Sequence, residues 1–392
     1  MQYRTMRDGT KVSVLGYGCM RFTSVNGKID LPKAEREVMK AIRYGINYFD
    51  TAYIYPGSED ALGRIFERNH CREKIHIADK LPYYLIHSAP AIDKYFNETL
   101  SRLRTDYVDF YLMHMLSDIK SWERMQSLGI TEWIDRKRKE GAIRQIGFSF
   151  HGDTDTFIRL LDAYDWDFCQ IQYNYLDEHT QAGRRGLQYA AKKGIPVIIM
   201  EPLRGGRLIT QLPAEAKQLM KQFDAKRSPA EWGLRWLWDQ PEVTCVLSGM
   251  NSLEMLRDNV RAANHAPAGC MSDAEHEIIR KVKGYIRKAQ KVGCTGCRYC
   301  MPCPQGVDIP AAFNSYNRLF LERKTSVIRE YFQVTSFKKE RSDMTRCIQC
   351  GKCERHCPQH IQIRAELKNA EKALMPAPVK LIMKAVNYIA NR

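Results

Sequence analysis

Residues 1–265 are patterned as short apolar segments that alternate with longer amphipathic ones. Eight of the short segments have the length and the β-branched or aromatic content of buried strands. They are VSVLGYG, INYFD, KIHIADK, VDFYLMH, IRQIGFSF, DFCQIQYN, IPVIIM and VTCVLSG. Helix-like segments such as KAEREVMKAIRYG and AIDKYFNETLSRLR lie between them. Eight strand-then-helix units in this length favour a closed parallel (β/α)8 TIM barrel over an open doubly wound sheet. The preceding QYRTM and RDGT predict a short hairpin before the first barrel strand.

The 392 residues exceed the usual size of one domain, so we expect two: a barrel over 1–270 and a mainly α-helical domain over 271–392. The N-terminal segment lacks the apolar run of a signal peptide, and no apolar stretch is long enough for a transmembrane segment, so we expect a cytoplasmic protein. The tail after Pro376 predicts a short amphipathic helix, and we favour packing on its own domain or subunit over contact with a membrane surface or a partner.

The formal net charge is +16, with basic residues spread along the whole chain. A nucleic-acid-binding protein more often gathers them in one aromatic-interleaved stretch. We therefore expect no nucleic-acid partner, but anionic ligands or an acidic redox partner protein. The sequence is compatible with a homo-oligomer and does not fix the oligomeric state. The GYG at Gly16–Gly18 lacks the third glycine of a dinucleotide-binding fingerprint, which favours a tight turn at the barrel mouth.

Chargeable residues end three consecutive strand candidates: Asp50, Lys80 and His114. Tyr55 follows Asp50 by five residues. In a barrel of this kind, residues at the carboxyl ends of the strands line the active site. A tyrosine hydroxyl beside a lysine is suited to proton transfer in carbonyl reduction, an aspartate holds the lysine, and a histidine hydrogen-bonds the carbonyl oxygen.

These residues lie in segments that resemble the aldo-keto reductase family: FDTAYIYPGSE, IADKLP, FYLMH, GFSFHG, QIQYN and EPLRGG. The resemblance covers residues 1–265 and implies a catalytic tetrad of Asp50, Tyr55, Lys80 and His114. Spacing within the family's motif selects Tyr55 over Tyr53. The resemblance further implies a nicotinamide cofactor, NADP or NAD, with NADP slightly favoured from the family.

By the same resemblance, Ser149 and Gln170 hold the carboxamide, and Met200 replaces a ring that stacks on the nicotinamide. The pyrophosphate passes the stretch from Pro202 to Gly206. The complete set of implied cofactor-binding residues is Gly18, Met20, Ser149, Gln170, Met200, Pro202, Leu203, Gly205, Gly206, Ser248, Gly249, Met250 and Asn259. The sequence departs from the family at Gly249 and Met255, where relatives place basic residues against the 2′-phosphate, and Arg257 or Arg204 are the candidates to compensate.

Eight of the thirteen cysteines fall within residues 294–357, in two runs of four that each end in Cys-Pro. We expect the remaining five to be core residues. The second run has the C-x2-C-x2-C-x3-C-P spacing of two-cluster ferredoxins, and the first differs from it by one residue. Structural zinc is the alternative for such spacings. The runs resemble dicluster ferredoxin domains of the α-helical kind, a tail found on a subgroup of aldo-keto reductases largely from anaerobes.

The ferredoxin pattern implies that the last cysteine of each run serves the other cluster. One [4Fe–4S] cluster then takes Cys294, Cys297, Cys300 and Cys357, and the second takes Cys303, Cys347, Cys350 and Cys353.

The sequence as a whole predicts an NAD(P)H-dependent oxidoreductase that reduces a carbonyl or oxidises an alcohol, with Tyr55 as proton donor and an iron–sulfur module for electron transfer. Three alternatives remain. In the first, the clusters pass electrons to the active site of the barrel. In the second, the protein is an iron–sulfur electron carrier or redox sensor whose barrel is a non-catalytic docking module, and in the third the clusters only hold the tail together. The substrate is not identified by the sequence.

Overall fold

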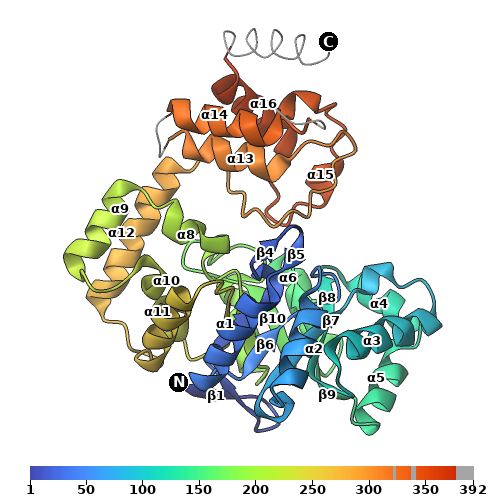
Figure 1. Ribbon diagram of the computed structural model, residues 1–392. Helices are drawn as coiled ribbons and strands as arrows, with labels where there is room; N and C mark the ends of the chain where they lie inside the picture. The colour runs from blue at the N-terminus through green and yellow to red at the C-terminus, as the bar shows by residue number, and fades with distance from the viewer. Residues whose placement is uncertain (321–323, 337–340, 377–392) are drawn as a thin grey trace. The chain divides into compact units, whose positions relative to one another are not determined.

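The computed structural model describes residues 1–320, 324–336 and 341–376 (Figure 1). Two compact units make up the chain. The first comprises Met1–Leu203 and Ala230–Ser272, and the second comprises Arg204–Pro229 and Asp273–Arg392. The second unit thus includes a segment, 204–229, that sequence order alone assigns to the barrel. The amphipathic helix expected in the tail lies outside the described residues.

The first unit is a closed barrel of eight parallel strands, so the predicted fold class is confirmed (Figure 1). Each of the eight predicted segments overlaps one barrel strand. The strands are β3 (Leu15–Gly18), β6 (Tyr48–Asp50), β7 (His76–Leu81), β8 (Val108–Leu116), β9 (Ile143–Phe150), β10 (Phe168–Gln172), β11 (Val197–Met200) and β12 (Val243–Ser248). They follow one another around the barrel in chain order, and β12 closes on β3.

Apolar side chains fill the barrel interior, as expected for strands that are buried on both faces. Tyr48, Phe110, Phe168 and Ile198 belong to one cluster of buried residues. Met6 and Val12 join the same cluster from the predicted hairpin, β1 (Tyr3–Thr5) and β2 (Lys11–Ser13). Four of the five isolated cysteines are buried, as expected, whereas Cys270 is partly exposed.

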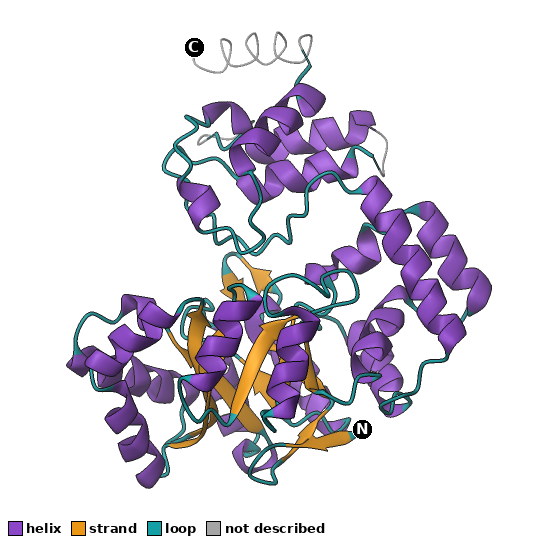
Figure 2. Ribbon diagram, turned by 180° about the vertical axis from the view of Figure 1, so that it is seen from behind, coloured by secondary structure: helices purple, strands orange, loops and turns teal. Residues whose placement is uncertain are grey.

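Helices pack outside the barrel (Figure 2). Several begin at a side-chain cap: Asp30, Asp118, Asp153 and Ser252 each accept a hydrogen bond from a backbone N–H in the first helical turn. The helices are α1 (Leu31–Arg43), α2 (Ser58–Arg68), α3 (Ala89–Leu103), α4 (Ile119–Ser127), α5 (Ile130–Lys139), α6 (Thr154–Asp162), α7 (Gly183–Lys192), α10 (Pro229–Trp238) and α11 (Leu253–Asn264). A two-stranded ribbon, β4 (Ser24–Val25) and β5 (Lys28–Ile29), follows β3.

The second unit consists of helices and loops, with no strand among its described residues (Figure 2). Its α-helices are α8 (Arg207–Thr210), α9 (Ala214–Phe223), α12 (Asp273–Ala289), α13 (Ile309–Arg318), α14 (Lys324–Thr335), α15 (Lys352–Arg355) and α16 (Ile363–Leu374). Phe313, Tyr331 and Leu367 form part of a buried core shared by α13, α14 and α16. No helix within the described ranges is long and apolar enough to span a membrane.

Candidate active site and cluster cavities

The four tetrad residues lie together at the carboxyl ends of adjacent barrel strands. Asp50 ends β6, Lys80 and His114 lie in β7 and β8, and Tyr55 lies in the loop after β6. The Nζ of Lys80 is 2.8 Å from Oδ1 of Asp50 and donates to the Thr51 carbonyl at 2.6 Å. The same Nζ lies 5.1 Å from the Tyr55 ring centroid, and the His114 ring lies 6.1 Å from that ring.

Lys80 is a buried cation, with only 1% of its surface exposed. Burial by itself lowers the pKa of a lysine, but the charge of Asp50 and its hydrogen bond to Lys80 outweigh it and hold the pKa of Lys80 above its ordinary value. Burial raises the pKa of Asp50, and the ion pair with Lys80 opposes that rise. The pair therefore keeps a positive charge fixed beneath Tyr55 in a site shielded from water.

Burial raises the pKa of Tyr55, and Lys80 offsets part of this rise without reversing it. Tyr55 is consequently protonated at neutral pH, while Lys80 lowers the cost of removing its proton. Burial, reinforced by the charge of Lys80, lowers the pKa of His114 far below its ordinary value. His114 is therefore a neutral imidazole, and its buried Nδ1 has no hydrogen-bond partner among the described residues.

Three of the expected carboxamide and nicotinamide residues are neighbours in the sheet. Gln170 of β10 is paired in register with Ser149 of β9, and Gln172 of the same strand is paired with Met200 of β11. The Oγ of Ser149 accepts a hydrogen bond from the Met115 N–H at 2.8 Å, which leaves its hydroxyl proton free to donate. The buried Oε1 of Gln170 lacks a partner in the described part of the chain. These polar groups are suited to binding a carboxamide.

The other expected cofactor residues fall in two places. Gly18, Met20, Ser248, Gly249, Met250 and Asn259 lie after β3 or at and beyond the end of β12, where the Asn259 side chain donates to Ser248 Oγ at 3.0 Å. Pro202 and Leu203 belong to the first unit, but Gly205 and Gly206 belong to the second. The two glycines have φ angles of 67° and 90°, a backbone conformation that favours glycine.

Two arginines, one in each unit, make contacts that the sequence did not predict. Arg204 is buried and donates to the Gly293 carbonyl at 3.0 Å, so its guanidinium is already engaged within the second unit. Arg21 lies beside Gly249: a Cβ added there would be 3.1 Å from its Cδ. The absence of a side chain at Gly249 leaves room for Arg21, and the glycine at this position was the available signal.

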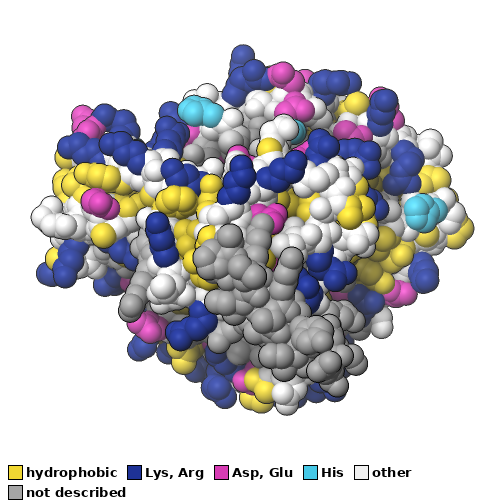
Figure 3. Space-filling model, turned by 90° about the horizontal axis from the view of Figure 1, so that it is seen from above, with side chains coloured by type: hydrophobic (Ala, Val, Ile, Leu, Met, Phe, Trp, Pro, Cys, Tyr) yellow, Lys and Arg dark blue, Asp and Glu magenta, His cyan; other side chains and the backbone are white. Residues whose placement is uncertain are grey.

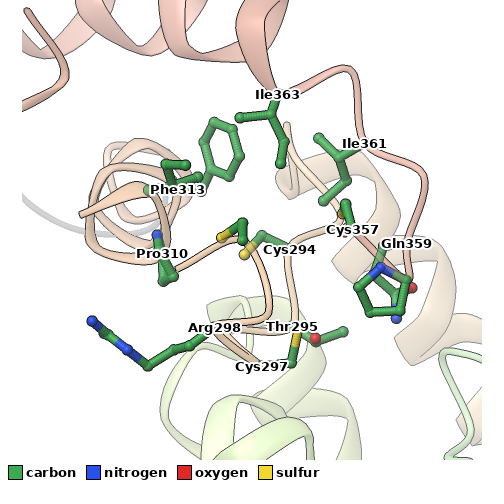
Figure 4. A pocket seen from close by; sticks show the side chains of 13 residues that line it. Cys294, Thr295, Cys297, Arg298, Pro310, Phe313, Cys357, Gln359, Ile361 and Ile363 are labelled. Carbon is green, nitrogen blue, oxygen red and sulfur yellow. The ribbon is translucent and has the colours of Figure 1, made fainter. Parts of the chain in front are cut away.

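The eight clustered cysteines line two cavities in the second unit, four to each. The first is lined by Cys294, Cys297, Cys300 and Cys357 (Figure 4). The second is lined by Cys303, Cys347, Cys350 and Cys353. The last cysteine of each run thus lines the cavity of the other run. Phe313, Ile361 and Ile363 give the first cavity an apolar wall.

The two cysteine loops share a backbone conformation. Gly296 and Arg298 flank the second cysteine of the first run with φ angles of 74° and 70°, and Gln349 and Gly351 do so in the second run with 59° and 73°. Alternation with left-handed residues turns successive N–H groups toward one side, which creates an anion-binding concavity typical of iron–sulfur sites. The Gly296 N–H also points at Cys294 Sγ, 3.4 Å away. Loops and cavities therefore fit clusters of net negative charge.

Arg207 lies against the first cysteine loop and was also missed by the sequence analysis. Its guanidinium donates to the Cys294 carbonyl at 2.5 Å. A side chain at residue 296 would collide with the same guanidinium, so Gly296 is required for this approach as well as for its backbone angle. The distance of 87 residues between Arg207 and Cys294 hides this contact from sequence inspection.

Comparison with known proteins decides the family. Residues 14–283 match the model of the aldo/keto reductase family, and residues 293–361 match that of a 4Fe-4S dicluster domain. The chain belongs to the aldo/keto reductase family. It carries an iron–sulfur domain after the barrel, and the resemblance inferred from the sequence is confirmed.

Its relatives include enzymes of different substrate classes. The chain is 29% identical to the L-galactose dehydrogenase of Arabidopsis thaliana, over 72% of this chain and 93% of the relative. It is 25% identical to the NADH-specific methylglyoxal reductase of Escherichia coli, over 66% and 89%. An aldo-keto reductase from Bacillus halodurans, in its holo form, has the same fold, with a TM-score of 0.60 and 24% identity over 72% of this chain and 96% of that one. An oxidoreductase is thus shown, and its substrate is not.

Proposed function

We propose that the protein interconverts a carbonyl and an alcohol by hydride transfer with a pyridine nucleotide, and that its iron–sulfur module serves electron transfer. The observation that carries the proposal is the buried Lys80–Asp50 pair, 2.8 Å apart, beneath the ring of Tyr55. A non-catalytic barrel has no need to bury a cation at this rim, because desolvation of both charges costs several kcal/mol.

In the proposed reduction, Tyr55 gives its proton to the carbonyl oxygen as negative charge develops there. Its raised pKa keeps the proton in place until then, and Lys80 stabilises the tyrosinate that remains. Asp50 orients Lys80 through their hydrogen bond. His114, held neutral, donates a hydrogen bond to the same oxygen and lowers the energy of the transition state.

The residues around Gln170 fit a nicotinamide, since a buried amide oxygen without a partner and a serine hydroxyl meet at the strand ends. When bound, the nucleotide supplies or accepts the hydride. Arg21 and Arg257 are the cationic candidates for its adenosine phosphates. We favour NADP slightly over NAD from the family, although one relative is named as NADH-specific.

The cysteines of the two cavities would hold one [4Fe–4S] cluster each, with Cys357 and Cys303 crossing between the runs. Such clusters supply one-electron chemistry. The observation that favours them is that each group of four thiols surrounds a cavity. Among the described residues, no group of three or more His, Cys, Asp or Glu side chains is arranged to hold a single metal ion.

Replacement of Tyr55 by Phe tests the proposal. We expect anaerobically reconstituted Tyr55→Phe to lose about 10²- to 10⁴-fold in kcat for NAD(P)H-dependent reduction of a panel of aldehydes and ketones, since general acid catalysis contributes about that much. Tyr53→Phe is the matched control, because Tyr53 lies two residues away and hydrogen-bonds to Glu98. No turnover in the wild type, or equal activity of Tyr55→Phe, contradicts the proposal and favours a non-catalytic barrel.

The direction of the pKa shifts also predicts the pH dependence. Reduction needs protonated Tyr55 and neutral His114, so kcat for reduction stays flat from about pH 7 to 9 and falls only above the ordinary tyrosine pKa of about 10. Alcohol oxidation needs the tyrosinate and rises with pH over the same interval. Steady-state kinetics in both directions measure the two profiles, and a reduction rate that falls steeply between pH 7 and 8 contradicts the assignment.

A further inference from the structure

Charge alone identifies no partner for this protein, because its Lys and Arg side chains are widely distributed over the face seen in Figure 3. One part of the second cysteine loop combines charge with other features. It comprises Arg346, Ile348, Cys350, Lys352 and Arg355, and we call it the Ile348 face. It is exposed at all five residues.

An unusually exposed apolar side chain marks this face. Ile348 is 62% exposed, the highest value among the large hydrophobic residues that the structure describes as exposed. Ile348 lines the second cavity, as does the preceding residue, Cys347. Gly351 follows three positions later. An isoleucine side chain that is exposed to water does not stabilise the free protein, whereas its burial against a partner would contribute about 1.5 to 3 kcal/mol to the free energy of binding.

The cations of the Ile348 face have no acidic partners in the described ranges. Arg346 donates through Nε to the Gln305 carbonyl at 2.7 Å, which fixes it at the rim of the second cavity. Lys352 and Arg355 are three residues apart on α15 and project from neighbouring positions of one turn. The nearby Glu354 does not neutralise them, because it forms an ion pair with Arg364 at 2.8 Å.

The first cysteine loop lacks this combination. Cys294 and Thr295 are buried, and the exposed Arg298 lies 3.5 Å from Asp308. The second loop therefore presents a cysteine, an apolar contact and unbalanced positive charge to solvent, whereas the first does not. Small, charged interfaces with a limited apolar centre are typical of transient redox complexes.

We propose that the Ile348 face is the docking surface for an acidic electron-carrier protein. Charge complementarity recruits the partner, and Ile348 supplies the apolar centre of the interface beside the second cavity. The proposal rests on the iron–sulfur part of the proposed function and is independent of carbonyl reduction in the barrel.

Binding to an acidic plant-type [2Fe–2S] ferredoxin, used as the probe, tests the proposal. Isothermal titration calorimetry with the cluster-loaded full-length protein is expected to show an affinity that falls at least tenfold when NaCl is raised from about 50 to 500 mM. Lys352→Glu/Arg355→Glu should weaken binding by at least tenfold at low salt. Ile348→Ser should weaken it several-fold and leave the salt dependence unchanged. Iron content and visible absorption confirm that each variant keeps its clusters.

The matched control reverses the same charge elsewhere in the second unit. Lys217 and Lys221 are exposed on α9, and Lys217→Glu/Lys221→Glu should bind the ferredoxin as the wild type does. Equal loss in this control, or undiminished binding by Lys352→Glu/Arg355→Glu, overturns the proposal. The proposal is also overturned if the wild type binds anionic lipid vesicles or duplex DNA but not ferredoxin, and the Ile348 face variants lose that binding. The binding experiment contains no carbonyl or alcohol substrate, so a negative result does not test the proposed reaction in the barrel.

Discussion

The barrel site and the cluster cavities are built in opposite ways. In the barrel, the chain supplies both halves of the main interaction: Lys80 is bonded to Asp50 and to the Thr51 carbonyl. In the second unit, each group of four cysteines surrounds a cavity, and Cys294 is itself part of the buried core. The difference suggests a contrast to test: the barrel site is completed by its own side chains, whereas we expect the packing of the second unit to depend on the clusters that its cysteines would hold.

Removal of the clusters should affect the folding of the two units differently, and this difference should exceed the effect of any single substitution. Anaerobic chelation of iron is expected to abolish the hydrogen-exchange protection of α13 and α16, because they pack on the cysteine-containing core and binding of metal is coupled to folding. The barrel strands should keep their protection. Hydrogen exchange followed by mass spectrometry measures both units in one sample.

A second probe reports on the barrel alone. All six tryptophans lie between residues 122 and 238 and within the first unit, so their fluorescence is expected to be unchanged by chelation. If α13 and α16 stay protected without iron, the second unit folds independently of its clusters, and the two units do not differ in this respect.

The barrel was predictable from sequence because its strands are buried on both faces, which leaves compact apolar runs such as IRQIGFSF over β9. The clustering of Asp50, Lys80 and His114 follows from the same regularity, since each ends an apolar run and parallel strands bring their ends to one rim. The cysteine groups could be predicted because their spacing is local.

Contacts between distant segments could not be predicted. Segment 204–229 follows a barrel strand in the sequence but packs with the second unit. Arg207 and Arg21 show the same limit, since each acquires its role from a glycine remote in sequence, Gly296 or Gly249. Nothing in the local composition around either arginine distinguishes it from the many solvated basic residues of this chain.

Acid should lower the free energy of unfolding of the barrel through one buried histidine, His151. Burial lowers the pKa of His151 to about 4, so it is neutral in the folded barrel and gains a proton on unfolding below its ordinary pKa of about 6.5. The stability it contributes is present above pH 6.5 and is lost as the pH falls toward 4. Between pH 7 and 5 we expect His151 to account for about 2 kcal/mol of the loss in the free energy of unfolding.

His151→Gln should remove that share of the acid sensitivity, as measured by urea titration with tryptophan fluorescence at the two pH values. His179→Gln, at an exposed position, is the control. Equal acid sensitivity in His151→Gln and the wild type would assign the effect to other groups, such as the buried His114.

The smallest expected effect is on the midpoint potentials of clusters bound in the two cavities. Arg207 lies against the first cysteine loop with no carboxylate within ion-pair distance among the described residues, whereas Arg364, beside Gly351 of the second loop, is paired with Glu354. An unbalanced cation favours the reduced, more negative state of a nearby cluster. Arg207→Gln is therefore expected to lower one midpoint potential by about 59 mV, a tenfold change in a one-electron equilibrium. Arg207→Lys should retain most of the wild-type potential, and Arg364→Gln should shift a potential less. Anaerobic redox titration monitored by EPR measures all three, and a larger shift in Arg364→Gln than in Arg207→Gln would reverse the proposed asymmetry between the cavities.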